Sequence, residues 1–298
     1  RKNNIPHRKV GKLIVATQDD EAVDLEKLLK LGEENGVEGL RIIGAKEAKS
    51  FEPNVCAIAA LYSAETGIID SHRLMQYYLD SAKDNGALAA FDSEVTSIEK
   101  LADGYKVSIK NNRDTLYLHA EHVINCAGLD SDKVAAMAGI DIKKSQYELS
   151  FCKGQYFRLT GNKARLIKGL VYPVPKPASG GLGIHATVDL SGGVRLGPDD
   201  EYLTSNTKDY SVSSARRHDF CASAVKFMPF LEEQDLLEDI AGIRPKLQKQ
   251  GGLFRDFVIR EESDKGFPKL VNLIGIESPG LTASCAIADH VRSIIDQF

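Results

Sequence analysis

The last thirty residues of the chain place an apolar strand, a glycine turn and an amphipathic helix in direct succession. The apolar run 270–276 stops at the turn Ser278-Pro279-Gly280. Beyond the turn, apolar residues recur at helical spacing, namely Ile287, Val291, Ile294 and Ile295. The pattern predicts a buried strand, a tight turn and a helix, as in α/β proteins.

The start of such a helix is a potential ligand site. Its unpaired N–H groups and the positive end of its dipole favour electron-rich groups, such as a phosphate or a carbonyl edge. Gly280 would let a ligand approach the backbone closely. The alternative is that this segment is only the last strand and helix of a sheet.

Length and composition exclude several classes of protein. A chain of 298 residues is expected to form one large domain or two intertwined ones. Its net charge of −4 predicts no nucleic-acid partner, and no apolar run is long enough for a transmembrane segment. Its five cysteines are widely spaced and form no C-x-x-C motif, which predicts neither a metal site nor disulfides. Free cysteines are typical of a reducing compartment.

Strand-type and helix-type patterns alternate up to about residue 140, and turn-rich strand patterns follow. We expect helices over 21–36, 72–85, 131–139, 213–227 and 234–240. We expect strands over 11–17, 87–91, 95–100, 105–110, 115–120, 122–128 and 257–260, and an antiparallel sheet over 147–197.

The candidate motifs each have a structural and a functional interpretation. Gly181-x-Gly183-x-x-Ala186 follows prolines and precedes a strand pattern, so we interpret it as a hairpin and not as a phosphate loop. Ala127 and Gly128 end a buried strand, which suits either a cofactor site or a plain strand end.

The candidate substrate residues likewise have two interpretations each. Arg244 and Lys246 follow a glycine turn, where a guanidinium fork would match a carboxylate but a surface ion pair would also fit. His185, Tyr156 and Tyr172 lie in strand patterns, as packing residues or as the lining of a pocket.

Taken together, nine segments resemble one family in their order and spacing. They are GKLIVAT, ETGIIDSHRL, VINCAGLDSDKVA, CKGQYFRL, VYPVP, LGIHATVD, VRLGPD, AGIRPKL and IESPGLTAS. The chain resembles the FAD-dependent L-2-hydroxyglutarate dehydrogenases, within the D-amino-acid-oxidase-like superfamily that includes glycine and sarcosine oxidases. The resemblance covers about residue 5 to residue 298.

The resemblance implies a mixed α+β and α/β fold with two domains. A glutathione-reductase-type FAD domain, lacking its first βαβ part, would comprise residues 65–140 and 240–298. A substrate domain on a mixed, mostly antiparallel sheet would comprise residues 10–64 and 141–239. The family opens with a strand, a G-x-G-x-x-G turn and a helix, none of which occurs here. We expect this segment to precede Arg1, and its absence to weaken FAD binding and to leave a sheet edge unpaired.

The implied reaction is hydride transfer from the carbinol carbon of a 2-hydroxy acid to flavin N5, with a quinone or another acceptor reoxidising the flavin. Arg244 would clamp the substrate carboxylate, and Lys246 would supply positive potential. His185 would take the hydroxyl proton, with a histidine in the segment expected before Arg1 as the alternative. Tyr156 and Tyr172 would line the substrate pocket. The FAD would contact Val95, Ala127, Gly128, Gly280, Leu281 and Thr282.

Two other functions stay open at this point. One is an amine oxidase of the glycine or sarcosine type, and the other is a flavin-free remnant that binds only a ligand or a partner chain. The expected location is the cytoplasm, with peripheral membrane association or, in a eukaryote, a mitochondrial location as the alternatives.

Overall fold

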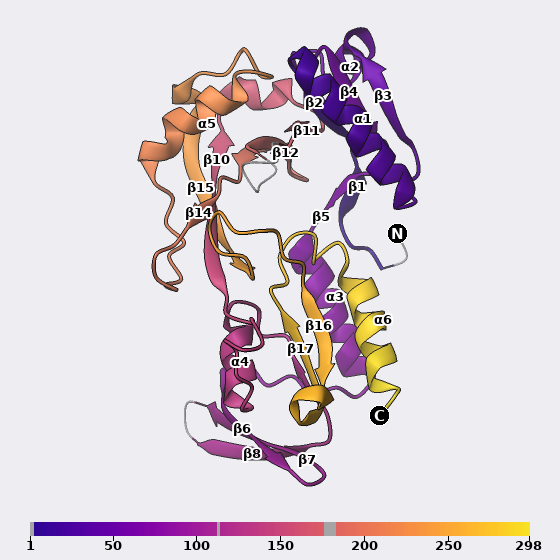
Figure 1. The fold of residues 1–298 in the computed structure, drawn as a ribbon. Helices are drawn as coiled ribbons and strands as arrows, with labels where there is room; N and C mark the ends of the chain where they lie inside the picture. The colour runs from indigo at the N-terminus through magenta and orange to yellow at the C-terminus, as the bar shows by residue number, and fades with distance from the viewer. Residues whose placement is uncertain (1–2, 112–113, 176–182) are drawn as a thin grey trace. The chain divides into compact units, whose positions relative to one another are not determined.

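The computed structural model describes residues 3–111, 114–175 and 183–298, and its elements are traced in Figure 1. The chain divides into two compact units. Unit 1 comprises Arg1–Leu88, Gly154–Asp200 and Tyr210–Gly242, and unit 2 comprises Ala89–Lys153, Glu201–Asp209 and Ile243–Phe298. Residues 65–88 thus fall in unit 1. The units are defined by compactness and not by ligands, so the predicted FAD and substrate domains stay predictions.

A mixed, mostly antiparallel sheet dominates unit 1. Its strand order is β14-β10-β13-β12-β11-β2-β4-β3, with β15 also beside β10, although the residues of β14 are assigned to unit 2. The β11–β2 pair is parallel, whereas β14–β10, β10–β13, β13–β12, β12–β11, β2–β4 and β4–β3 are antiparallel. The strands are β2 (Lys12–Ala16), β3 (Leu40–Gly44), β4 (Ala59–Ser63), β10 (Ser150–Leu159), β11 (Leu170–Pro173), β12 (His185–Val188), β13 (Val194–Gly197), β14 (Glu201–Tyr202) and β15 (Leu236–Lys246). The predicted fold class, with a mixed and mostly antiparallel sheet, is confirmed.

Alternating side chains give the central strands of this sheet two different faces. One face is apolar and fully buried, with Leu13, Val171, Leu196 and Phe157 packed in one core with Phe220 of α5 (Arg217–Ala224). The other face carries half-exposed and polar residues on β10, β11, β12 and β13. A mostly antiparallel sheet commonly packs one face on the hydrophobic core and leaves the other face accessible to solvent or a ligand.

Helices and a separate pair of strands make up the remainder of unit 1. α1 (Asp19–Glu34) packs on β2, β3 and β4, where Leu25 is fully buried beside Leu61 (Figure 1). The other elements are α2 (Ala45–Phe51), α3 (Ser71–Asp84) and the strand pair β1 (His7–Lys9) with β5 (Gly67–Ile69). The predicted helix over 72–85 is confirmed as α3, and Asp70 accepts a hydrogen bond from Arg73 N at its start, at 3.0 Å.

The described part of unit 2 contains two small sheets and two α-helices. One sheet has the order β16-β17-β9, and the other is the predicted meander β6-β7-β8. The strands are β6 (Ser93–Leu101), β7 (Gly104–Asn111), β8 (Thr115–Ala120), β9 (Val123–Asn125), β16 (Val258–Glu262) and β17 (Phe267–Ile274), and the helices are α4 (Ser131–Met137) and α6 (Ser284–Ile295). Among the described residues β9 pairs only with β17, so its other edge lacks a strand partner.

Two predicted elements are wrong and one is too long. Residues 87–91 form no strand. Of residues 234–240, predicted as a helix, the first two end a 3₁₀ turn and the others begin the strand β15, because pairing with β10 overrides the helical spacing of Leu236, Leu237 and Ile240. The predicted helix over 213–227 is a short 3₁₀ turn followed by α5. In the glycine motif, Gly181 lies outside the described residues, whereas Gly183 is followed by β12 and not by a helix.

Candidate functional site

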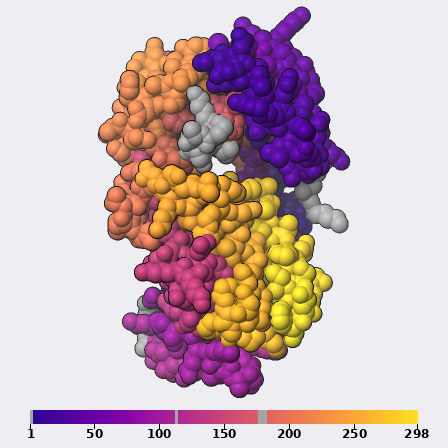
Figure 2. All heavy atoms as spheres, viewed as in Figure 1, coloured from indigo at the N-terminus to yellow at the C-terminus, as the bar shows by residue number. Residues whose placement is uncertain are grey.

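An apolar groove in unit 2 lies where the predicted cofactor turn meets the end of a buried strand. It encloses about 650 Å³ between the ends of β9 and β17 and one side of α6. Its lining is Ile124, Cys126, Gly128, Leu273, Ile276, Gly280, Ser284, Ile287, Ala288, Val291, Arg292 and Ile295. Gly128 and Gly280, both predicted to contact FAD, therefore line the same groove. α6 itself, yellow in Figure 2, lies on the molecular surface.

The turn before α6 is shaped by close backbone approaches. A Cβ on Gly280 would lie 2.5 Å from Ile276 Cγ2 and 2.7 Å from the carbonyl oxygen of Glu277, so the turn itself requires glycine. By contrast, a Cβ on Gly128 would meet nothing within 4 Å, although its φ of +57° favours glycine. The groove is thus open at Gly128, where a flat ring or a sugar chain could approach the backbone.

Lys246 and Glu277 form an ion pair that holds this turn against β15. Lys246 Nζ lies 2.9 Å from Glu277 Oε1, and their side chains are only 7% and 13% exposed. Beside them, Gly275 packs on Leu247, whose Cδ1 would lie 2.8 Å from an added Cβ. The charge of Lys246 is therefore balanced within unit 2, and the pair positions the turn. The predicted catalytic role of Lys246 stays a prediction.

The end of β9 is held by buried amides that the sequence analysis did not identify. The Asn125 side chain donates to Ser131 O at 2.7 Å and to Asn272 Oδ1 at 2.8 Å, and it accepts from Ala127 N at 3.2 Å. Asn272 in turn donates to Glu262 Oε1 at 3.0 Å. An asparagine inside the apolar run VINCA was the available signal, because a buried amide needs partners.

The other predicted FAD residues do not line the groove. Leu281 and Thr282 are exposed in the turn before α6, and Ala127 is exposed beside Gly128. Val95 pairs with Ile109 of β7 at a register shift in the strand. Their contacts with a cofactor stay predictions.

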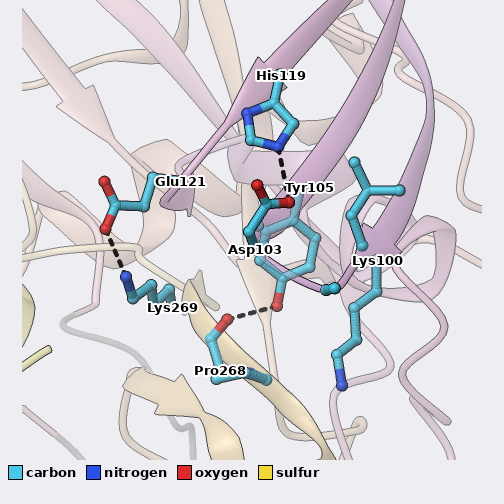
Figure 3. Close-up of a pocket in the computed structure, with 10 residues that line it drawn as sticks. Lys100, Asp103, Tyr105, His119, Glu121, Pro268 and Lys269 are labelled. Carbon is cyan, nitrogen blue, oxygen red and sulfur yellow. Dashed lines mark hydrogen bonds and ion pairs between the residues drawn. The ribbon is translucent and has the colours of Figure 1, made fainter.

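A second hollow of about 470 Å³ in unit 2 contains no predicted site residue (Figure 3). Its lining holds two lysines and two carboxylates, so its formal charges sum to zero. Lys269 pairs with Glu121 at 2.5 Å, and His119 lies 3.2 Å from Asp103. The Lys100 ammonium donates to Gly266 O at 2.7 Å. The Lys100 and Lys269 contacts attach the β6-β7-β8 sheet to the region of β17, whereas the His119–Asp103 contact lies within that sheet.

The polar face of the unit 1 sheet brings together three of the four predicted substrate residues, namely Tyr156, Tyr172 and His185. Strand register places Tyr172 opposite His185, because Val171 pairs with Ala186. It likewise places Tyr156 opposite Gly197, because Phe157 pairs with Leu196. A Cβ on Gly197 would lie 2.9 Å from Tyr156 Cδ1, so this glycine gives the tyrosine ring room.

His185 is a buried imidazole with a defined tautomer. It is 5% exposed, and its ring stacks on Tyr172 with the centroids 3.7 Å apart at 14°. Its Nδ1 lies 3.0 Å from Gly183 O, and a carbonyl only accepts, so Nδ1 must carry the hydrogen of this bond. In the neutral ring the basic lone pair is then on Nε2.

Burial shifts the pKa values of Tyr172 and Lys12, two residues on the same face of the sheet as His185. It raises the pKa of Tyr172, although a hydrogen bond with Thr187 acts in the opposite direction. Tyr172 therefore remains a neutral hydroxyl at physiological pH. Burial also lowers the pKa of Lys12, whose Nζ lies 5.3 Å from the centre of the Tyr172 ring. Lys12 lies within GKLIVAT, but it was not predicted as a site residue.

Arg244, the predicted carboxylate clamp, lies on β15 in unit 2. It is half-buried and two residues before Lys246, so the two side chains leave the same side of the strand. Its role stays a prediction.

Comparisons with known proteins agree with this arrangement of elements. The chain belongs to the FAD-dependent oxidoreductase family, whose sequence profile matches residues 1–294. It is 37% identical over 328 residues to the mitochondrial L-2-hydroxyglutarate dehydrogenase of Arabidopsis thaliana, with 97% of this chain and 67% of that protein covered. The family resemblance inferred from the sequence is confirmed, as is FAD as the cofactor of the family.

Solved structures give the same result for the fold. The FAD-bound L-α-glycerophosphate oxidase of Mycoplasma pneumoniae superimposes with a TM-score of 0.84 at 25% identity, over 98% of this chain and 74% of that chain. The glycine oxidase of Bacillus cereus superimposes with a TM-score of 0.76 at 16% identity, over 99% and 75%. Within the described part of the chain, no helix has the length and hydropathy needed to cross a membrane.

Proposed function

We propose that this protein oxidises the carbinol carbon of a 2-hydroxy acid, of the L-2-hydroxyglutarate type, to the 2-oxo acid with FAD as the hydride acceptor. The observation that carries the proposal is the buried His185, stacked on Tyr172 and oriented by Gly183 O, on the polar face of a sheet. The similarity to L-2-hydroxyglutarate dehydrogenases supports this choice of substrate.

The residues of unit 2 would hold the cofactor. Gly128 would give the flavin access to the backbone, Gly280 would line the same groove, and the apolar side chains of the groove would pack against the flavin ring. Ala127, Leu281, Thr282 and Val95 would contribute further contacts. When bound, FAD supplies the hydride acceptor of the reaction. A quinone or another acceptor would then reoxidise it.

The substrate would be bound and deprotonated by this chain's own side chains. His185 Nε2 would accept the hydroxyl proton, because Nδ1 is committed to Gly183 O. Arg244 would bind the carboxylate with two parallel N–H donors. Tyr156 and Tyr172 would line the face that carries His185. Lys246, paired with Glu277, would act by holding the turn.

Anaerobic mixing of the FAD-loaded protein with candidate substrates tests the proposal. We expect L-2-hydroxyglutarate to bleach the visible flavin band, and L-glycerol 3-phosphate, glycine and sarcosine to leave it unchanged. Bleaching by the amines alone would instead identify an amine oxidase, which the fold shared with glycine oxidase also accommodates. A colourless protein that cannot take up FAD would favour the flavin-free alternative.

His185→Gln tests the role of the imidazole. General-base catalysis contributes about 10²–10⁴-fold, so we expect a loss of that order in the rate of flavin reduction, with little change in substrate affinity. His218→Gln is the matched control, because His218 is exposed and paired with Glu233. Equal rates for the His185 variant and the control would exclude His185 as the base.

A further inference from the structure

Lys12 begins β2, and it points to the same face of the unit 1 sheet as Tyr172 and His185. Lys12 pairs with Leu170 of β11 in the parallel register, and Leu170 is two residues before Tyr172. Side chains two residues apart share a face, so Lys12 and Tyr172 lie on the same side of the sheet. The ammonium lies over the Tyr172 ring, 5.3 Å from its centre.

Within the described residues, this ammonium lacks an acidic partner, unlike the buried lysines Lys153 and Lys246. Lys246 pairs with Glu277 at 2.9 Å, and Lys153 pairs with Asp209 at 2.8 Å. Lys12 is half-buried, and within residues 3–111, 114–175 and 183–298 no carboxylate forms an ion pair with it. Burial, and not a neighbouring charge, accounts for its lowered pKa. An uncompensated cation in such a position is costly unless a ligand supplies the counter-charge.

We propose that Lys12 binds the second carboxylate of a dicarboxylic 2-hydroxy acid, the one remote from the hydroxyl group. The inference rests on the proposed function and adds to it the residue that would select dicarboxylic over monocarboxylic substrates. It makes Lys12 a specificity-determining residue and not a catalytic one.

The strand order indicates that Lys12 would bind the remote carboxylate of the substrate and not the carboxylate next to the hydroxyl group. Lys12 is on β2, Tyr172 on β11 and His185 on β12, and these strands are consecutive in the sheet. Neighbouring strands are about 4.8 Å apart, and Lys12 is offset from His185 by two residues along the strands, so their backbones are separated by roughly 12 Å. A carboxylate bonded directly to the carbinol carbon would be held near the base. A carboxylate three carbons further along the substrate could reach across Tyr172 toward Lys12.

The test compares two substrates that differ only in this group. L-2-hydroxyglutarate and L-2-hydroxyvalerate share a five-carbon chain, and a methyl group in the second replaces the remote carboxylate of the first. For Lys12→Met in the holoenzyme, we expect the KM for L-2-hydroxyglutarate to rise about tenfold or more, with kcat little changed. The kcat/KM for L-2-hydroxyvalerate should stay at the wild-type value.

Lys9→Met is the matched control, because Lys9 is exposed and already paired with Glu65. It should leave both substrates unaffected. Lys12→Arg keeps the positive charge and should retain the preference for the dicarboxylic acid. If the methionine variant does not fold, Lys12→Gln, which also removes the charge but keeps a polar side chain, takes its place, and a retained preference in it would overturn the role of Lys12.

Binding of glutarate gives a readout that does not depend on flavin chemistry. By calorimetric titration of the full chain, we expect glutarate to bind more tightly than valerate, and Lys12→Met to abolish that difference. An unchanged preference in Lys12→Met, by KM or by calorimetry, would overturn the role of Lys12 and leave the proposed function standing. A wild-type holoenzyme whose flavin is reduced by no 2-hydroxy acid would overturn the proposed function and this inference with it.

Discussion

Tyr105 shows how a single hydroxyl joins two sheets within unit 2. Its ring is almost fully buried on β7, and its hydroxyl donates to Pro268 O of β17 at 2.7 Å (Figure 3). Burial, with a smaller contribution from the Glu261 charge, raises the pKa of Tyr105 to about 12. The ionised form is therefore disfavoured in the folded protein at this position.

The raised pKa predicts a loss of stability in alkaline solution. An unfolded tyrosine ionises near pH 10, so the contribution of Tyr105 is complete below about pH 10 and is lost as the pH rises toward 12. Tyr105→Phe should remove this pH dependence and lower the free energy of unfolding at neutral pH by about 1 kcal/mol. Urea unfolding at several pH values measures both effects.

Tyr117→Phe is the control for this prediction, because Tyr117 lies on the neighbouring strand β8 and is 64% exposed. It should change neither quantity. An alkaline slope that is the same in both variants would show that Tyr105 is not its source.

At the scale of elements, the connection between β15 and the turn before α6 determines where the groove begins. Neither partner of the Lys246–Glu277 pair has an obvious signal in the sequence, because they are 31 residues apart in the chain. The helical spacing of Leu236, Leu237 and Ile240 also obscured β15 itself. Asp239 of this strand pairs with Arg195 and Arg158, contacts that a helix over 234–240 would not provide.

Breaking this ion pair should strongly destabilise unit 2. Lys246→Met would leave the Glu277 carboxylate buried without its counter-charge, and we expect a loss of about 3–5 kcal/mol in the free energy of unfolding. The double variant Lys246→Met/Glu277→Leu should recover most of that loss. Denaturant titration of both variants makes the comparison.

Lys30→Met provides the surface control, because Lys30 and Glu34 form an exposed pair on α1. Its effect should stay within about 0.5 kcal/mol. If Lys246→Met were as mild as this control, the pair would not hold the turn.

At the scale of the whole molecule, each unit encloses a hydrophobic core of its own. The unit 1 core includes Leu196 and Phe157, and the unit 2 core includes Leu270 and Phe151. Chains with more than one core commonly depart from two-state unfolding.

Scanning calorimetry should therefore show a calorimetric enthalpy larger than the van't Hoff enthalpy. Leu196→Ala and Leu270→Ala remove buried side chains from different cores, each at a cost of about 2–5 kcal/mol. Each variant should lower the midpoint of a different component. If both shifted one and the same transition, the two cores would unfold together.

The sequence by itself determined the elements whose signals are local. The turn Ser278-Pro279-Gly280, the helix after it, the helix over 72–85 and the meander all follow from spacing, glycine and capping residues within a few positions. The order of short segments also indicated the family, which the comparisons confirm.

Only the tertiary structure decided what depends on distant partners. The stacking of His185 on Tyr172, the position of Lys12 over the same tyrosine ring, and the pairing of Lys246 with Glu277 join residues from different strands and turns. Residues 236–246 likewise form a strand because they pair with the edge of β10. Strand register and burial set these relations, and they arise only when separate parts of the chain pack against one another, so no local pattern encodes them.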